Sequence, residues 1–168
     1  MAMRKPQTLI DGNAIINGRH SLGVVAKIKL PEVAFSTTEQ KAGGFTREVV
    51  NGLFEKLEGE LAFKEFHEKA YELLAQSHLV SDGAEVIIKG SIYQDGKHLP
   101  IVAIWVGNSS IEDGELEAGE DIERTLKFKL TKATLTINGK QEYFLDSDNW
   151  VGIVNGVDLL ERVRKNVM

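Results

Sequence analysis

The chain has 168 residues, no cysteine and a formal net charge of −5, with 42% apolar and 27% charged residues. This length fits one domain with a sizeable core, and we expect a single domain over residues 1–168. The composition excludes an intrinsically disordered chain, a disulfide scaffold and a cysteine-ligated zinc or iron–sulfur site. The acidic balance disfavours a surface that grips nucleic-acid phosphates.

Pairs of turn residues indicate the fold class. Asp-Gly occurs at 11–12, 82–83, 95–96 and 113–114, and Asn-Gly occurs at 17–18, 51–52, 138–139 and 155–156. Such pairs supply the positive φ angles that tight hairpin turns require. Eight of them in one small domain predict a largely antiparallel β protein.

The N-terminal part predicts a hairpin followed by an exposed excursion. Residues 14–16 and 22–30 flank the Asn17-Gly18 turn. In the second run, every second residue is apolar and lysines lie between, which predicts one strand with one buried face. The expected buried residues are Val24, Ala26, Ile28 and Leu30. Residues 35–45 are polar and glycine-containing, and we expect them to lie outside the core.

The middle of the chain fits two periodicities. Between residues 46 and 63, apolar side chains recur at helical spacing, but Leu57, Leu61 and Phe63 also fit the alternation of a strand. After that the pattern is clearer, because an apolar stripe with charged neighbours predicts one helix over residues 64–76. The stripe consists of Phe66, Ala70, Leu73 and Leu74.

The C-terminal half predicts strands and turns. Residues 86–93 and 99–106 flank the Asp95-Gly96 turn as a second hairpin, and residues 112–123 form an acidic loop with seven Asp or Glu residues. In the long strand 125–137 the apolar residues change parity between Leu130 and Ala133, which predicts a bulge or a change of surface. A strand at 142–145 and a short helix at 159–165 complete the chain.

Motifs for chemistry are lacking. The histidines have no zinc-ligand spacing, and Ala118 and Arg124 occupy the positions where a calcium loop starting at Asp113 needs glycine and glutamate. No nucleophile elbow or phosphate loop occurs. We therefore expect no enzyme, no metal and no cofactor, and four surface histidines at His20, His67, His78 and His98.

Together, the features resemble the major tail tube protein of contractile-tailed bacteriophages, a family that includes the tube proteins of R-type pyocin-like particles. The resemblance covers nearly the whole chain, and its most specific piece is a closing Asn-Gly-Val-Asp before a basic tail. The matching segments are Lys29-Leu30-Pro31, Glu39-Gln40-Lys41-Ala42-Gly43-Gly44, the leucines 53, 57 and 61, Gly90-Ser91-Ile92-Tyr93, Ala118-Gly119-Glu120, and Asn155, Gly156, Val157 and Asp158.

The resemblance implies a structural protein. Its subunits would form six-membered rings that stack into a hollow tube inside a contractile sheath, a conduit for DNA ejection or membrane puncture. The implied fold is mainly β, a small β-barrel or sandwich with one flanking helix and a long hairpin arm. The implied partners are further copies of the chain and the sheath, baseplate, tape measure and tail terminator proteins. DNA would pass the lumen without specific binding, membrane contact would occur only during ejection, and the protein would belong to the virion tail after assembly in the host cytoplasm.

Three sets of residues become candidates for assembly contacts. We expect the segment 35–53 to be an inter-ring arm that orders on assembly, with Thr37, Glu39, Gln40, Gly43, Gly44, Phe45 and Arg47 as its contacts. We expect the acidic loop to meet a basic sheath surface, with lumen lining as the alternative, through Glu112, Asp113, Glu115 and Glu117. A strand at 56–61 would bury Leu57 and Leu61 and point three charged side chains into the lumen, those of Lys56, Glu58 and Glu60. If the segment is a helix instead, these charges are simply its solvent-exposed face.

Two other readings of the chain stay open at this point. A ring protein of a type VI secretion-like tube shares the implied architecture but matches the segments less well. A monomeric β-barrel that binds a small ligand needs aromatic side chains around a pocket, and aromatic residues are only 7% of this chain.

Overall fold

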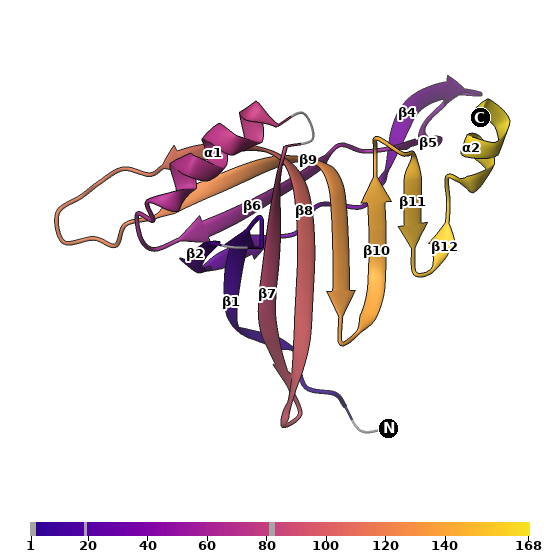
Figure 1. The fold of residues 1–168 in the computed structure, drawn as a ribbon. Helices are drawn as coiled ribbons and strands as arrows, with labels where there is room; N and C mark the ends of the chain where they lie inside the picture. The colour runs from indigo at the N-terminus through magenta and orange to yellow at the C-terminus, as the bar shows by residue number, and fades with distance from the viewer. Residues whose placement is uncertain (1–2, 19, 81–82) are drawn as a thin grey trace.

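The structure is a computed structural model that describes residues 3–18, 20–80 and 83–168. Figure 1 shows a large antiparallel sheet with a separate hairpin and two short helices, so the predicted mainly β fold is confirmed, and the second helix matches the short helix predicted at residues 159–165. The strands are β1 (Thr8–Ile16), β2 (His20–Val24), β3 (Lys27–Lys29), β4 (Phe35–Ala42), β5 (Phe45–Phe54), β6 (Leu57–Phe63), β7 (Ala84–Gln94), β8 (Lys97–Asp113), β9 (Arg124–Ile137), β10 (Lys140–Asp146), β11 (Val151–Val154) and β12 (Val157–Asp158), and the helices are α1 (Lys69–Leu79) and α2 (Glu161–Val167).

Strand β9 is the branch point of the large sheet. The main path runs β12-β11-β10-β9-β8-β7-β1-β2, and β6 pairs with both β9 and β3. The first half of β9 pairs with β6 and its second half with β10, while β8 lies along nearly its whole length. The two long strands therefore connect a curled part of the sheet, formed with β1, β2, β3, β6 and β7, with a C-terminal part formed by β10, β11 and β12.

The link between β2 and β3 closes the curled part. The Val25 N–H donates to Gly12 O of β1 at 2.9 Å, and the next N–H, of Ala26, donates to Ala62 O of β6 at 2.8 Å. Residues 22–30 are thus two strands on two neighbours, and the prediction of one strand was wrong. Because the chain crosses over here, Val25 is buried whereas Val24 is 63% exposed, the reverse of the predicted parity.

The predicted parity change in the long strand is a β-bulge. Val106 lies opposite Lys132 and Gly107 lies opposite Leu130, so Thr131 is the extra residue. Its hydroxyl donates to Val106 O at 3.2 Å. A Cβ on Gly107 would lie 2.1 Å from Lys129 O, so glycine is required at this close approach.

The core is built around Trp105 and extends to Tyr143 and Leu145 of β10. Trp105 is fully buried and meets the Phe128 ring edge-on at a centroid distance of 5.5 Å. A Cβ on Gly59 would lie 2.7 Å from Trp105 Cη2, so the indole lies directly on the backbone of β6. Helix α1 closes this core with Ala70 and Leu73.

Helix α1 begins later than predicted. It spans Lys69–Leu79, whereas the sequence pattern placed it at residues 64–76. Phe66 lies outside the helix and is 44% exposed, with the Arg124 guanidinium 4.6 Å from its ring centroid, so it does not belong to the buried stripe. His67 Nδ1 accepts the Lys69 N–H at 3.2 Å at the point where the helix starts.

Four of the predicted turn pairs have positive φ at both residues, and they join strands at Asn17-Gly18, Asp95-Gly96, Asn138-Gly139 and Asn155-Gly156. Other pairs serve differently: Asp11-Gly12 lies inside β1, and Asp113-Gly114 ends β8. Gly52, with φ +81°, lies within β5 where the pairing with β4 shifts register. Residue 82 of the remaining pair lies outside the described residues.

Candidate assembly surfaces

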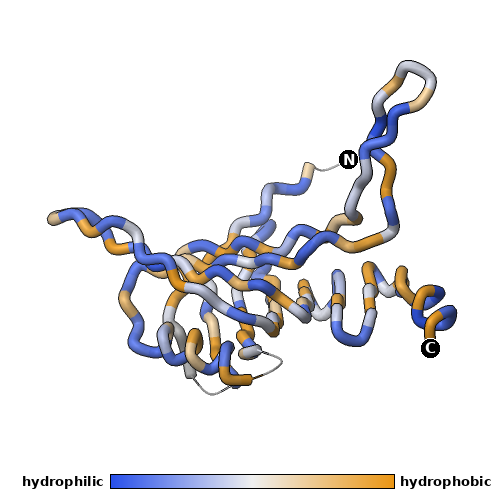
Figure 2. Tube along the Cα trace, turned by 90° about the horizontal axis from the view of Figure 1, so that it is seen from above, coloured by the Kyte–Doolittle hydropathy of each residue, from blue (hydrophilic) through white to orange (hydrophobic). Residues whose placement is uncertain are grey.

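The hairpin β4–β5 is an arm that stands away from the rest of the chain (Figures 1 and 2). All residues from 37 to 53 are exposed, as expected for an excursion outside the core. Its base is fixed to the body: the Phe35 and Phe54 rings stack at 4.5 Å, and Phe54 lies against Gly152 of β11. The Glu55 N–H donates to Ala34 O at 2.8 Å, so the arm leaves and re-enters the body at one point.

The register of the arm gives it two different faces. On one face, Thr38 lies opposite Val49, Gln40 opposite Arg47 and Ala42 opposite Phe45. We call these six residues the Phe45 face. Arg47 donates from Nε and Nη2 to Gln40 Oε1, at 3.1 and 2.8 Å, which fixes its side chain on this face. Phe45 is 78% exposed beside the Gly43-Gly44 turn.

The other face of the arm is acidic. Glu39 lies directly opposite Glu48, a like-charge pair that destabilises a hairpin. Lys41 Nζ lies 3.3 Å from Glu39 Oε1 and offsets part of the repulsion. One face of the arm therefore exposes an aromatic ring to solvent, and the other carries two acids of like charge side by side.

The charges next to the arm lie on a strand, so a helix there is excluded. In β6, Gly59 and Leu61 are buried and Leu57 is half-buried, while Glu58 and Glu60 lie on the opposite face. Glu58 lies across from Lys129, and Glu60 lies between Lys29 and Lys127 on the neighbouring strands. Lys56, just before β6, pairs with Glu58 at 3.2 Å, and Lys29 pairs with Glu60 at 4.0 Å. This surface alternates in charge and is not uniformly acidic.

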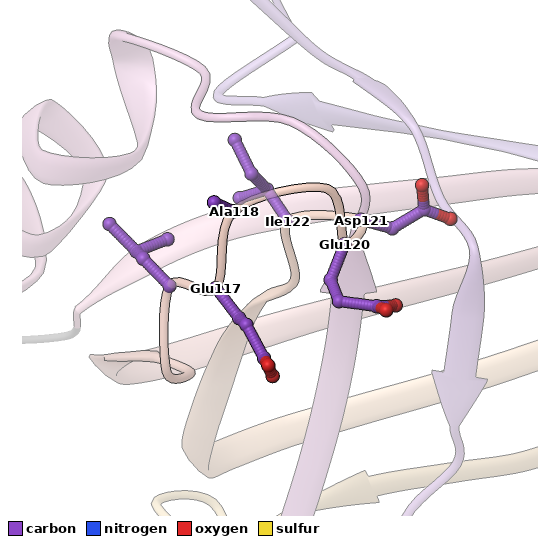
Figure 3. A pocket seen from close by; sticks show the side chains of 6 residues that line it. Glu117, Ala118, Glu120, Asp121 and Ile122 are labelled. Carbon is purple, nitrogen blue, oxygen red and sulfur yellow. The ribbon is translucent and has the colours of Figure 1, made fainter.

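Two of the four predicted sheath-contact residues lie outside the acidic loop. Glu112 and Asp113 belong to β8, where Glu112 pairs with Lys127 and Asp113 pairs with Arg124. Glu115 and Glu117 lie in the loop and are exposed. The loop curls around a shallow hollow (Figure 3), which is open and formed by the loop alone, from Leu116, Glu117, Ala118, Glu120, Asp121 and Ile122.

Arg124 fixes the base of this loop. Its guanidinium donates to both carboxylate oxygens of Asp113, at 2.6 and 3.0 Å, and lies 4.6 Å and 5.0 Å from the centroids of Phe66 and Tyr71. The hydrogen bonds from Arg124 lower the pKa of Asp113 below its usual value. The sequence pattern showed Arg124 only as a residue that excludes calcium, so this role was missed.

The closing motif builds the C-terminal end of the sheet. Asn155-Gly156 turns β11 into β12, and Asp158 Oδ1 accepts the Leu160 N–H at 3.0 Å before α2 begins at Glu161. Asp158 also pairs with Arg164, which lowers the pKa of that carboxyl, and Arg164 donates to Trp150 O at 2.7 Å. The motif is thus a scaffold for α2, none of whose residues is buried.

A further surface has no counterpart in the predictions from sequence. Six side chains lie in register across six strands, and we call them the outer sheet row: Ile15, Ile87, Ile104, Thr134, Phe144 and Ile153. All are half-buried, and apart from Gly152 beside Ile153 their strand neighbours on either side belong to the core or pack against it. The sequence signal for this row is that several strands carry apolar residues on both faces. The residues can be assigned to one row only once the register of the six strands is known.

Among the residues that the structure describes, no three His, Asp or Glu side chains come together as a metal site. Neither described helix has the length and apolar content needed to cross a bilayer.

Comparison with known proteins identifies relatives of the whole chain. A model of the family described as phage tail tube protein FII matches residues 6–167. The tail tube protein of Escherichia phage P2 is 28% identical over 172 residues, which cover 98% of this chain and 99% of that protein. Among solved structures, a sheath/tube terminator of an extracellular contractile injection system superposes with a TM-score of 0.55 at 14% identity, covering 80% of this chain and 99% of the other. The cap of the anti-feeding prophage also gives 0.55, at 16% identity over 81% of this chain and 94% of the other. These two likenesses concern the fold.

Proposed function

Because the chain belongs to the phage tail tube protein FII family, a structural and not an enzymatic family, we propose that it assembles into six-membered rings that stack as the inner tube of a contractile tail or tail-like injection system. The tube is the conduit for DNA ejection or for membrane puncture. A closed ring of identical subunits leaves no unpaired sheet edge at the interface, which suits a chain with a branched, open sheet.

The observation that carries this proposal is the match of family and relative over nearly the full chain, and the exposed arm supports it. A two-stranded hairpin is at best marginally stable in water, so an arm exposed from residue 37 to 53 favours a role in which another molecule covers it. The proposed partners beyond further subunits are the sheath, baseplate, tape measure and tail terminator proteins.

Assembly of the purified chain tests the proposal. We expect rings or tubes by size-exclusion chromatography and negative-stain microscopy, and a compact monomer under all concentrations and salts would contradict it. Deleting residues 37–47 should leave the melting temperature of the body nearly unchanged and abolish tubes. The matched control is a deletion of residues 116–121 at the other protruding loop, which should still assemble if the arm alone joins the rings.

The lumen-facing residues form the second part of the proposal. We propose that Lys56, Glu58 and Glu60 face the bore, where the lysines on neighbouring strands make the wall mixed in charge. Such a wall neither holds nor strongly repels phosphates. Changing Glu58 and Glu60 to lysine removes the acids and should make intact tubes retain DNA at low salt. Glu161→Lys with Glu142→Lys, two acids outside β6, is the control with equal charge change. Equal retention by both variants, or a tube map with the three side chains outside the bore, would contradict the assignment.

The acidic loop is the proposed sheath contact. Of the four predicted residues, Glu115 and Glu117 lie in this loop and are exposed, so we propose that they make the contact. Replacing both with alanine should weaken sheath binding at low salt more than at high salt, because exposed charges are screened. An unchanged sheath affinity at low salt would argue against this contact.

A further inference from the structure

The outer sheet row is a half-buried, mostly apolar surface on the side of the sheet that faces away from the core. Ile87 lies between the buried Val86 and Ile88, and Ile104 lies between the buried Ala103 and Trp105, so these side chains occupy the outward face of the sheet. Val102 and Val106, the next outward-facing residues of β8, are also half-buried. The row crosses six strands, and with a strand spacing of about 4.8 Å it is about 24 Å long.

The Phe45 face of the arm is the complementary feature. It presents Phe45, Val49 and Ala42 with the methyl group of Thr38, and its strands pair only with each other within the described chain. The face spans residues 38–42 of β4, which at about 3.4 Å per residue is about 14 Å, so one arm can cover part of the row. One chain thus presents exposed apolar side chains on the arm, on either side of the Gln40–Arg47 pair, and an apolar row on the sheet.

Charge favours the same pairing. Arg47 is held on the Phe45 face by Gln40, and it is the one cation among those six residues. Glu85 lies on the outward face beside the row, two residues from Ile87 on β7, and it is exposed. An arm laid across the row can therefore place Arg47, in the middle of its Phe45 face, against Glu85 beside the row.

We propose that the Phe45 face of one subunit packs across the outer sheet row of a second copy of the chain. This inference rests on the proposed self-assembly, and it names the surface that receives the arm. The contact is heterologous, since arm and row are different surfaces, so each subunit gives an arm to one neighbour and receives one from another.

The absence of cysteine permits a direct test by mixed cross-linking. Phe45→Cys and Ile104→Cys proteins are prepared separately, mixed, allowed to assemble and oxidised. We expect a disulfide-linked dimer that contains one copy of each, and little cross-linking in either protein alone. Val49→Cys with Thr134→Cys gives a second pair, which serves if the first substitutions impair assembly. Ala75→Cys, exposed on the outer side of α1, replaces Ile104→Cys as the control and should give no dimer.

The outcomes separate this inference from the proposed function. If the mixed variants form normal tubes and neither pair cross-links, the docking surface is wrong while the tube function stands. Dimers of Ile104→Cys with itself would also overturn the inference, because rows would then face each other. A chain that never assembles overturns both.

Ile104→Asp should stay folded and lose tubes; normal tubes that lose only the sheath would assign the row to the sheath instead. Arg47→Glu should impair assembly and Glu85→Arg should restore it, and failure of this rescue in a folded double variant would speak against the pairing.

Discussion

The hairpins β7–β8 and β4–β5 are both long antiparallel hairpins, and they differ in where their side chains lie. In β7–β8 alternate residues are buried against the rest of the core, with Trp105 and Val86 fully covered. In the arm no residue from 37 to 53 is buried. Apolar burial supplies most of the stability of a fold, so the first hairpin is stabilised by its own chain, whereas the second gains little from it and is proposed to be covered by another subunit. The same local structure can thus serve folding in one region and assembly in the other.

Removing the central side chain of the core tests the stable region most strongly. Trp105→Ala should lower the free energy of unfolding by about 3–5 kcal/mol, because it removes a fully buried indole and leaves a cavity. Urea unfolding followed by circular dichroism measures the loss. Phe45→Ala is the matched aromatic truncation in the arm, and an equal loss there would contradict the comparison.

Adding a methyl group at Gly59, where the indole of Trp105 leaves no room, should have the next largest effect. In Gly59→Ala the new methyl group would lie 2.7 Å from Trp105 Cη2, and the overpacking should cost about 1–3 kcal/mol. The control is Gly114→Ala, whose nearest neighbour would be Glu123 O at 3.6 Å. Similar melting temperatures for both variants would mean that the core relaxes around Trp105 at no cost.

Arg124 links the stable body to a protruding loop. Arg124→Ala leaves the Asp113 carboxylate without its main partner and should cost about 1–3 kcal/mol. We also expect faster proteolytic cleavage within residues 114–123. Arg162→Ala removes an exposed arginine from α2 and should change neither property. A loop that resists protease equally in all three proteins would show that Arg124 does not fix it.

Acidification tests the two ion pairs at the edges of the body. Hydrogen bonds from arginine lower the pKa values of Asp113 and Asp158 in the folded chain. The stabilisation is therefore complete above the unfolded pKa near 3.9 and is lost as the pH falls through the lower folded values. Melting temperature should drop more steeply below about pH 4 in the wild type than in Asp113→Asn with Asp158→Asn. Parallel curves would contradict this assignment.

The smallest effect on stability is expected at the tip of the arm. Phe45→Ser should change the free energy of unfolding by less than about 0.5 kcal/mol, because the ring is 78% exposed, and should still abolish tubes. Unfolding in urea and negative-stain microscopy measure the two properties. A large loss of stability would show that the arm already contributes to the isolated fold.

Local patterns predicted those parts of the molecule in which local chemistry decides the structure. Asn-Gly and Asp-Gly pairs placed four turns, and the parity change between Leu130 and Ala133 located a bulge. The crossover at Val25 could not be found in this way, because it depends on two distant neighbours: β2 before it pairs with β1, and β3 after it pairs with β6. The start of α1 was missed because Phe66 fits the helical stripe in sequence but lies outside the helix beside Arg124.

The assembly surfaces depended on longer-range order. Exposure of the arm followed from its polar sequence, and the alternation of Glu58 and Glu60 with buried residues followed from period two. The lysines that face these acids come from β3 and β9, so the mixed charge of this surface needed the register. The outer sheet row likewise exists only after six strands are aligned.

The single point at which the arm joins the body has a consequence for how such chains diverge. Ala34 and Glu55 are bridged by one backbone hydrogen bond, so the ends of the intervening segment are neighbours in space. A segment with adjacent ends can be lengthened, shortened or exchanged at little entropic cost and without moving the strands that hold it. Insertions and grafted hairpins between these two residues should therefore be tolerated by folding, which makes this joint the place where a related chain can acquire a different reach or carry a foreign peptide.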